Sequence, residues 1–170
     1  MAAGKTLLMA AAAEIGAGKG VADLAPALSA LVVEAGAAAL RARRAGLAAR
    51  IKPDGSPVTA ADEAAEAVIL AGLAQLLPEV PVVSEESVAP HVRATSLFML
   101  VDPLDGTREL VAGRDEFTVN VALIDGGVPI LGVVAAPALR LLWRGGRDVS
   151  PARFVISEEG MLREGDPVAL

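Results

Sequence analysis

The amino-acid sequence predicts an α+β fold in which N-terminal helices pack on a largely antiparallel sheet. Two helical segments come first, and β-rich runs joined by short turns fill most of the chain after them. Helices followed by a series of hairpins favour a segregated α+β arrangement over an alternating, doubly wound sheet. The length of 170 residues suits one domain, or one domain and part of a second.

The helices are predicted from residue periodicity and from the residues that interrupt it. Over residues 24–50, apolar side chains such as Leu24, Leu28 and Leu31 recur at three- and four-residue spacing, which is typical of an amphipathic helix. The segment "KPDGSPVT" at 52–59 then contains two prolines and an Asp-Gly pair, which favour a loop. Thr59 and Asp62 match a capping box, so we expect a second helix from there to Leu77, just before a proline.

The strands are predicted from short apolar runs bounded by turn residues. "VPVVS" at 80–84 and "LFMLV" at 97–101 fit buried strands, and residues 107–113 fit a short helix or loop. "FTVNVALI" and "VPILGVVAAP" flank "DGG", which predicts a hairpin. "RLLW" at 140–143 and the segment 153–170, turning at Glu159-Gly160, can supply further strands.

The composition excludes several classes of protein. Hydrophobic residues make up 54% of the chain and aromatic residues 2%, which predicts an aliphatic core. The net charge of −6 and pI near 4.8 disfavour binding to a nucleic acid polymer, and we interpret the basic cluster around Arg41, Arg43 and Arg44 as a solvated helix face. No apolar stretch is long enough for a transmembrane helix, and Glu14 interrupts the apolar run after Lys5, so we expect a cytoplasmic protein.

Acidic side chains fall at the ends of predicted elements. Glu85 and Glu86 follow one strand, Asp102 and Asp105 follow the next, and Asp62 lies in the first turn of the second helix. Each of them alone also fits a simpler role as a helix cap, a solvated charge or a turn residue. Carboxylates that converge at one edge of a sheet repel one another unless protons or cations neutralise them. Oxygen ligands without cysteine favour magnesium, which we expect as the cofactor.

The segment "DPLDGT" at 102–107 offers more than two carboxylates. Pro103 fixes the backbone so that the Leu104 carbonyl can turn inward as a further oxygen ligand. Gly106 and Thr107 offer backbone N–H groups where a helix can start, which suits a phosphate. The Thr107 hydroxyl can help to orient a water molecule.

Three motifs in this order resemble the inositol monophosphatase superfamily of magnesium-dependent, lithium-sensitive phosphatases. They are "DGSPVTAADEAAE" at 54–66, "SEES" at 84–87 and "DPLDGT" at 102–107. The longer run "LVDPLDGTRELVAGRDEFTVNVALIDGGVPILGVVAAP" at 100–137 looks most like the 3'(2'),5'-bisphosphate nucleotidases of the sulfur-assimilation type. The resemblance implies the first half of the sugar-phosphatase fold, a small phosphorylated substrate and, as in many members of the family, a homodimer.

The resemblance also implies a role for each matching residue. Asp62 and Thr107 match the pair that activates the attacking water, and Gly106 and Thr107 match the phosphate cradle. The implied metal ligands are Glu85, Asp102, the Leu104 carbonyl and Asp105. The implied reaction is hydrolysis of adenosine 3',5'-bisphosphate to AMP and phosphate, with inositol monophosphatase or another sugar phosphatase as an alternative.

One motif of the family does not occur in this sequence. Members carry a "WDxAA" block in a second domain, whereas the tryptophan here, Trp143, is followed by "RGGRD". We therefore expect residues 1–170 to form the N-terminal metal- and phosphate-binding domain, with the second domain absent, activity impaired and an apolar face exposed. A non-catalytic metal-binding or dimerising domain is the alternative outside the enzymes.

Overall fold

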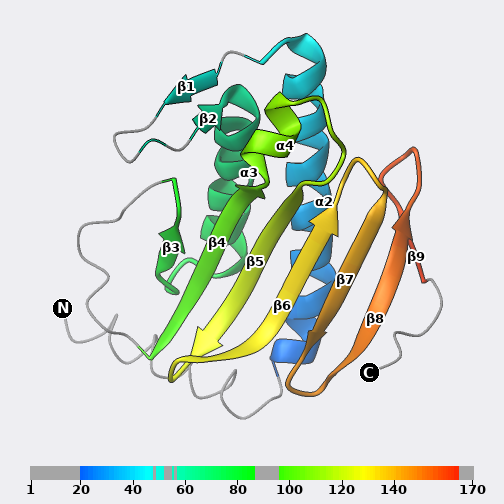
Figure 1. Cartoon of the computed structure of the whole chain (residues 1–170). Coiled ribbons are helices and arrows are strands. Elements are labelled where there is room, and N and C mark those ends of the chain that lie inside the picture. Colours follow the sequence, from blue (N-terminus) through cyan, green and yellow to red (C-terminus); the bar gives the residue numbers. More distant parts are fainter. Residues whose placement is uncertain (1–19, 48, 52–54, 56, 87–95, 165–170) are drawn as a thin grey trace.

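The computed structural model describes residues 20–47, 49–51, 55, 57–86 and 96–164, and it shows long helices packed on a seven-stranded sheet (Figure 1). The strands follow the order β3-β4-β5-β6-β7-β8-β9, in which β3 pairs with β4 in parallel and every other pair is antiparallel. The predicted α+β class is therefore confirmed. The sheet strands are β3 (Val82–Ser84), β4 (Leu97–Asp105), β5 (Thr118–Asp125), β6 (Val128–Ala136), β7 (Leu141–Gly146), β8 (Val149–Ile156) and β9 (Leu162–Glu164).

The first helix, α2 (Val21–Ala45), ends five residues before the predicted boundary at Arg50. Gly46 follows it with a φ of 107°, and its N–H donates to the Arg43 carbonyl, so a glycine terminates the helix where a residue with a side chain would be strained. The chain then forms β1 (Ala49–Ile51), which pairs with β2 (Pro57–Thr59) in a separate two-stranded sheet. The predicted helix over 46–50 was therefore wrong.

The second helix, α3 (Ala60–Leu76), begins at the predicted capping box. The Thr59 hydroxyl accepts a hydrogen bond from the N–H of Ala61, and the Asp62 carboxylate accepts one from the N–H of Thr59. The helix ends within one residue of the predicted boundary, and Leu77 caps it by donating to the Leu73 carbonyl.

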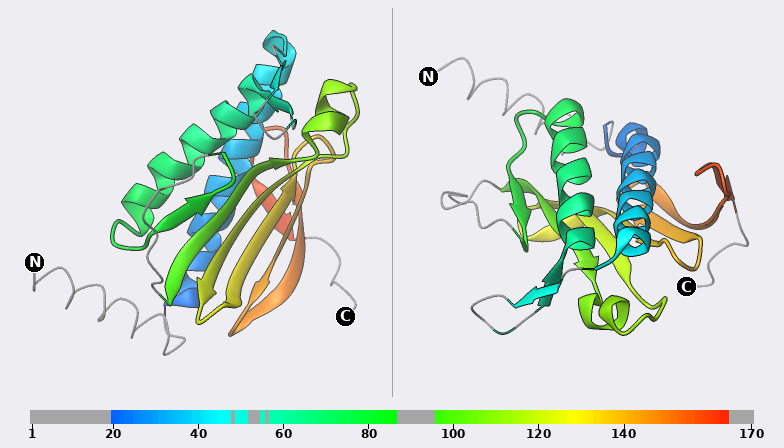
Figure 2. Two further views of the ribbon diagram at one scale, coloured as in Figure 1. Left: turned by 60° about the vertical axis from the view of Figure 1, so that its left-hand side comes forward. Right: turned by 90° about the horizontal axis from the view of Figure 1, so that it is seen from above.

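Both long helices cover the same face of the sheet, as the left view of Figure 2 shows. Side chains on this face, such as Met99, Val121 and Val133, are buried and form the aliphatic core. The opposite face carries apolar side chains that no described helix covers, among them Leu100 and Val155, which are 46% and 42% exposed. The expected packing of a second domain against an exposed apolar face stays a prediction.

Helix α2 is long and apolar enough to cross a membrane by length and composition alone. In this structure 56% of its apolar window is buried, against α3 and the sheet. It therefore serves as a core helix of the described domain.

Strand β4 continues further than the sequence predicted. We expected a strand over 97–101 followed by a turn, but the strand extends through Asp105. Asp102 pairs with Asn120 and Asp105 pairs with Thr118, so β4 uses one more residue than β5 over this interval and forms a bulge. Proline lacks the N–H that a regular ladder needs, and Pro103 is accommodated where the ladder is interrupted.

The remaining strands form the predicted antiparallel meander. Gly126 and Gly127 link β5 to β6 with φ values of 57° and 81°, as a tight two-residue hairpin requires. The predicted turn at Glu159-Gly160 lies between β8 and β9, and Gly160 has a φ of 78° there.

Candidate metal and phosphate site

Asp62 lies at the centre of a hydrogen-bond network that joins α3 to the end of β4. Its side chain is fully buried, with 0% of its surface exposed. Oδ2 accepts from the backbone N–H of Thr59 at 2.8 Å and from the Thr59 hydroxyl at 2.6 Å, and Oδ1 accepts from the Thr107 hydroxyl at 2.9 Å. The capping contacts fix the carboxylate, and Oδ1 is left to face Thr107.

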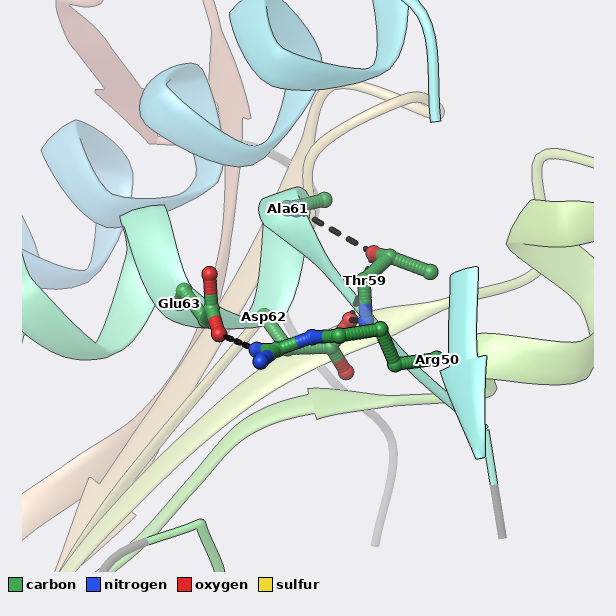
Figure 3. Close-up of polar contacts among 5 residues, drawn as sticks. All are labelled: Arg50, Thr59, Ala61, Asp62 and Glu63. Carbon is green, nitrogen blue, oxygen red and sulfur yellow. Dashed lines mark hydrogen bonds and ion pairs between the residues drawn. The ribbon is translucent and has the colours of Figure 1, made fainter. Parts of the chain in front are cut away.

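Figure 3 shows an ion pair between β1 and the first turn of α3. Arg50 of β1 reaches across the capping box and forms an ion pair with Glu63, beside Asp62. Both charged side chains are more than half exposed, so the pair adds little to stability. Strand β2 continues directly into α3, which keeps the β1–β2 sheet beside the first turn of the helix.

Thr107 begins the short helix α4 (Thr107–Val111), and Gly106 separates it from the end of β4 at Asp105. Its hydroxyl lies 2.9 Å from Asp62 Oδ1 and 3.3 Å from the Leu104 carbonyl oxygen. The hydroxyl has one proton, and the shorter contact indicates that it donates to Asp62. The predicted catalytic residues Asp62 and Thr107 therefore lie in direct contact, and the predicted Leu104 carbonyl faces the same place.

The bulge in β4 positions the predicted carboxylate ligands. The Leu104 N–H donates to Asp102 Oδ1 at 3.2 Å, and Asp105 ends the strand with an exposed side chain. Glu85 directly follows β3. Ser84 pairs with Val101, and the Glu85 N–H donates to the Val101 carbonyl at 3.1 Å. Because Ser84 pairs with Val101 in parallel strands, the residues that follow them, Glu85 and Asp102, are neighbours.

Negative charge accumulates around Asp102. Partial burial, repulsion from Glu85 and Asp105, and a hydrogen bond with the Glu85 carboxyl raise the pKa of Asp102 to about 6. The hydrogen bond from the Leu104 N–H acts in the opposite direction. Repulsion that raises the pKa of a carboxyl marks a place where a bound cation would be favourable.

The donor set therefore fits a hard cation in its chemistry, since it consists of carboxylate and carbonyl oxygens. The positions of these donors do not form a complete metal site. Among the described residues, no group of three or more acidic, His or Cys side chains could hold a metal ion. The structure brings Glu85 and Asp102 into contact, while Asp105 acts on Asp102 through its charge. The assignment of these three side chains as metal ligands stays a prediction.

Gly106 separates the carboxylate strand from α4 and adopts a left-handed conformation with a φ of 94°. A Cβ atom here would lie 2.9 Å from the Glu116 carbonyl oxygen and 3.2 Å from Phe117 Cα and Cβ. Glycine is required because both the backbone angle and the close approach of the next strand exclude a side chain. The phosphate-binding role of Gly106 and Thr107 stays a prediction.

One contact near the site was not predicted. The buried Ser84 hydroxyl donates to Glu66 Oε1 at 2.6 Å, which ties the end of β3 to α3 beside Glu85. Glu66 follows Asp62 by four residues, and this helical spacing places both on one face of α3, so the sequence did contain a signal. Lys52 and His91, which the sequence places in polar loops, lie outside the described residues.

The sequence and the fold match a known family of phosphatases. The sequence profile of the inositol monophosphatase family matches residues 21–154, most of the chain, and the chain belongs to that family.

Curated relatives give a narrower similarity. The chain is 55% identical over 94 residues to the 3'(2'),5'-bisphosphate nucleotidase CysQ of Salmonella typhimurium, a match over 54% of this chain and 38% of that protein. It is 40% identical over 92 residues to the histidinol-phosphatase of Mycobacterium tuberculosis, covering 54% of this chain and 35% of that one. The chain thus matches less than half the length of these relatives.

Solved structures agree with the fold. CysQ from Bacteroides thetaiotaomicron is 30% identical and superposes with a TM-score of 0.64 over 81% of this chain and 53% of that chain. The extragenic suppressor protein SuhB of Bartonella henselae is 26% identical, with a TM-score of 0.68 over 75% of this chain and 50% of that one. The similarity to the bisphosphate nucleotidase group expected from the sequence is therefore confirmed.

Proposed function

We propose that the protein is a magnesium-dependent phosphomonoesterase that hydrolyses adenosine 3',5'-bisphosphate to AMP and phosphate. The contact between the Thr107 hydroxyl and the buried Asp62 carboxylate carries this proposal. It gives a proton route away from an attacking water, next to a group of carboxylates that suits a divalent cation. The similarity to bisphosphate nucleotidases supports the choice of substrate.

The chemistry of Thr107 follows from its hydrogen bond. Because its proton points at Asp62 Oδ1, a lone pair of Oγ1 is available to accept a proton from water. As the water oxygen bonds to phosphorus and the bond from phosphorus to the 3' oxygen breaks, the water proton moves to Thr107 Oγ1 and the Thr107 proton moves to Asp62 Oδ1. The departing 3' oxygen takes a proton from solvent and becomes a hydroxyl of AMP. Burial of Asp62 and its two contacts with Thr59 keep the acceptor oxygen in place.

A magnesium ion would be held by Glu85, Asp102, Asp105 and the Leu104 carbonyl. When bound, it would neutralise these carboxylates and lower the pKa of a coordinated water. The N–H groups of Gly106 and Thr107, at the start of α4, would face the phosphate oxygens.

Phosphate release separates the candidate substrates. The 170-residue chain should be assayed with adenosine 3',5'-bisphosphate, inositol 1-phosphate and histidinol phosphate, each in magnesium and in excess EDTA. Preferential, magnesium-dependent release from adenosine 3',5'-bisphosphate is expected, with Asp62→Asn as the inactive control. Preference for inositol 1-phosphate or histidinol phosphate would overturn the substrate assignment.

Absence of turnover needs its own interpretation, because the chain spans less than half the length of its curated relatives. If magnesium raises the melting temperature but no substrate is hydrolysed, these residues form a metal-binding unit that does not catalyse the reaction alone. Gel filtration tests the expected homodimer in the same samples, and cell fractionation tests the expected cytoplasmic location.

A further inference from the structure

Arg43, in the last turn of α2, contacts the loop between α4 and β5. Its Nη1 donates to Asp115 Oδ1 at 2.8 Å and its Nη2 donates to the Gly113 carbonyl at 2.9 Å. Its guanidinium carbon lies 5.7 Å from the centre of the Phe117 ring. The side chain is only 21% exposed, so Arg43 is a packed, forked contact and not the solvated residue that the sequence suggested.

The loop that Arg43 holds forms the wall behind Gly106. The Glu116 carbonyl oxygen and the Phe117 backbone come so close to Gly106 that no Cβ would fit between them. The Phe117 side chain is 2% exposed, with the Arg43 guanidinium over its ring. A displacement of this loop therefore changes the space in which Gly106, and Thr107 after it, are held.

Helix α4 has little capacity to position itself. It contains five residues, Thr107–Val111, and a helix this short is not stable without tertiary contacts. Its end is tied back into the same loop, because the Gly113 N–H donates to the Leu110 carbonyl and the Arg114 N–H donates to the Glu109 carbonyl. By contrast, α2 is 25 residues long and packs across β5, β6, β7 and β8, so it is the rigid partner in this contact.

We propose that Arg43 is a positioning residue of the phosphate site, which fastens the 113–117 loop to α2 and thereby fixes Gly106 and Thr107. This inference rests on the proposed function. It assigns a role in phosphate binding to the end of α2. This role is separate from that of the predicted metal ligands, which lie on β4 and directly after β3. Misplacement of a catalytic group by about 1 Å can lower a rate about 100-fold, so a surface contact of small energetic value can still matter for catalysis.

The test compares Arg43→Met with Arg44→Met in the full chain. Arg44 lies in the same last turn of α2 and is exposed, and no hydrogen bond or ion pair joins it to the residues that the structure describes, so it is a matched control. Calorimetry with inorganic phosphate on the magnesium-loaded protein should show about tenfold weaker binding in Arg43→Met and no change in Arg44→Met. Magnesium affinity should be equal in both, and Arg43→Lys should recover only part of the phosphate affinity because it lacks the fork.

Hydrogen exchange tests the positioning without any ligand. The amides of Leu110 and Ala112, which bond within α4, should exchange at least several-fold faster in Arg43→Met than in Arg44→Met. Equal exchange in the two variants would overturn the inference even if neither variant bound phosphate. Failure of the wild-type protein to bind phosphate, with faster exchange in Arg43→Met, would instead contradict the proposed function alone.

Discussion

The Thr107 hydroxyl donates a 2.9 Å hydrogen bond to Asp62 Oδ1, joining two residues that are 45 positions apart in the chain. Asp62 belongs to the first turn of α3, and Thr107 begins α4 after the bulged end of β4. The same carboxylate caps α3 through Oδ2. One buried side chain therefore contributes to both stability and chemistry, and a useful variant must separate the two contributions.

Thr107→Val separates them because it removes the hydroxyl and leaves the capping box intact. We expect magnesium-dependent phosphate release to fall about 10²- to 10⁴-fold, the usual contribution of a positioned proton-transfer group. The free energy of unfolding should fall by about 1.5–3 kcal/mol, because an oxygen of the buried Asp62 carboxylate loses its hydrogen-bond partner. Initial-rate assays and urea unfolding measure the two effects.

The control is Ser157→Ala, which removes a hydroxyl that bonds within the β8–β9 turn at the other edge of the sheet. It should leave phosphate release unchanged. If Thr107→Val lowers the rate no more than Ser157→Ala does, the proton route through Thr107 is wrong.

The raised pKa of Asp102 predicts an unusual effect of pH on stability. In the folded protein its pKa is raised to about 6 from its ordinary value of 3.8, so the folded state binds more protons than the unfolded state between these values. The contribution of Asp102 to the free energy of unfolding must then decrease as pH rises from about 4 to 6, and it stays unfavourable above 6. Asp102→Asn removes this effect.

We therefore expect metal-free Asp102→Asn to be more stable than the wild type at pH 7.5, by on the order of 1 kcal/mol because water screens the half-buried carboxyl. The difference between the two proteins should shrink as pH falls towards 4. Unfolding in urea with EDTA measures it, and Glu79→Gln, an exposed carboxylate in the turn after α3, is the control. A destabilised Asp102→Asn at pH 7.5 would show that Asp102 is not under repulsion.

Magnesium should reverse this order of stability. A ligand that binds only the folded state stabilises it, by about 2.7 kcal/mol at a concentration 100 times its dissociation constant. At pH 7.5 the wild-type melting temperature should rise with magnesium, whereas that of Asp102→Asn should rise much less because a ligand is lost. Glu79→Gln should respond as the wild type does. A wild-type melting temperature that ignores magnesium would remove the basis for the metal site.

The features of the fold that could be predicted from the sequence are those whose residue patterns are local. The capping box of Thr59 and Asp62 lies within four residues, and the "DGG" hairpin lies between two β-rich runs, so both could be predicted. The end of α2 was missed because the apolar periodicity continues past Gly46, where left-handed geometry outweighs side-chain pattern. The extension of β4 was missed because a bulge depends on the partner strand.

The candidate site residues also differ in how local their sequence patterns are. Motif spacing predicted that Asp62, Asp102 and Thr107 belong to one site, because the proposed chemistry requires these residue types near the ends of elements. The structure places Asp62 and Thr107 in contact, and the roles of all three stay predictions. It could not identify Arg43, whose contacts are 70 and 72 residues distant in the chain. Without tertiary structure, a basic residue in the last turn of a helix is adequately explained by the helix dipole.

The requirement for glycine at position 106 can be tested against a second glycine of similar backbone conformation. Gly106 and Gly127 have φ values of 94° and 81°, but a Cβ on Gly106 would lie 2.9 Å from the Glu116 carbonyl oxygen, whereas nothing lies within 4 Å of one on Gly127. Gly127→Ala should therefore lose only the cost of left-handed geometry, about 1–2 kcal/mol. Gly106→Ala should lose about 1–3 kcal/mol more, because the crowded backbone must move. Urea unfolding gives both values, and phosphate release should fall only in Gly106→Ala. Equal losses of stability in the two variants would mean that the wall behind Gly106 yields freely, and that its close packing does not hold the phosphate site.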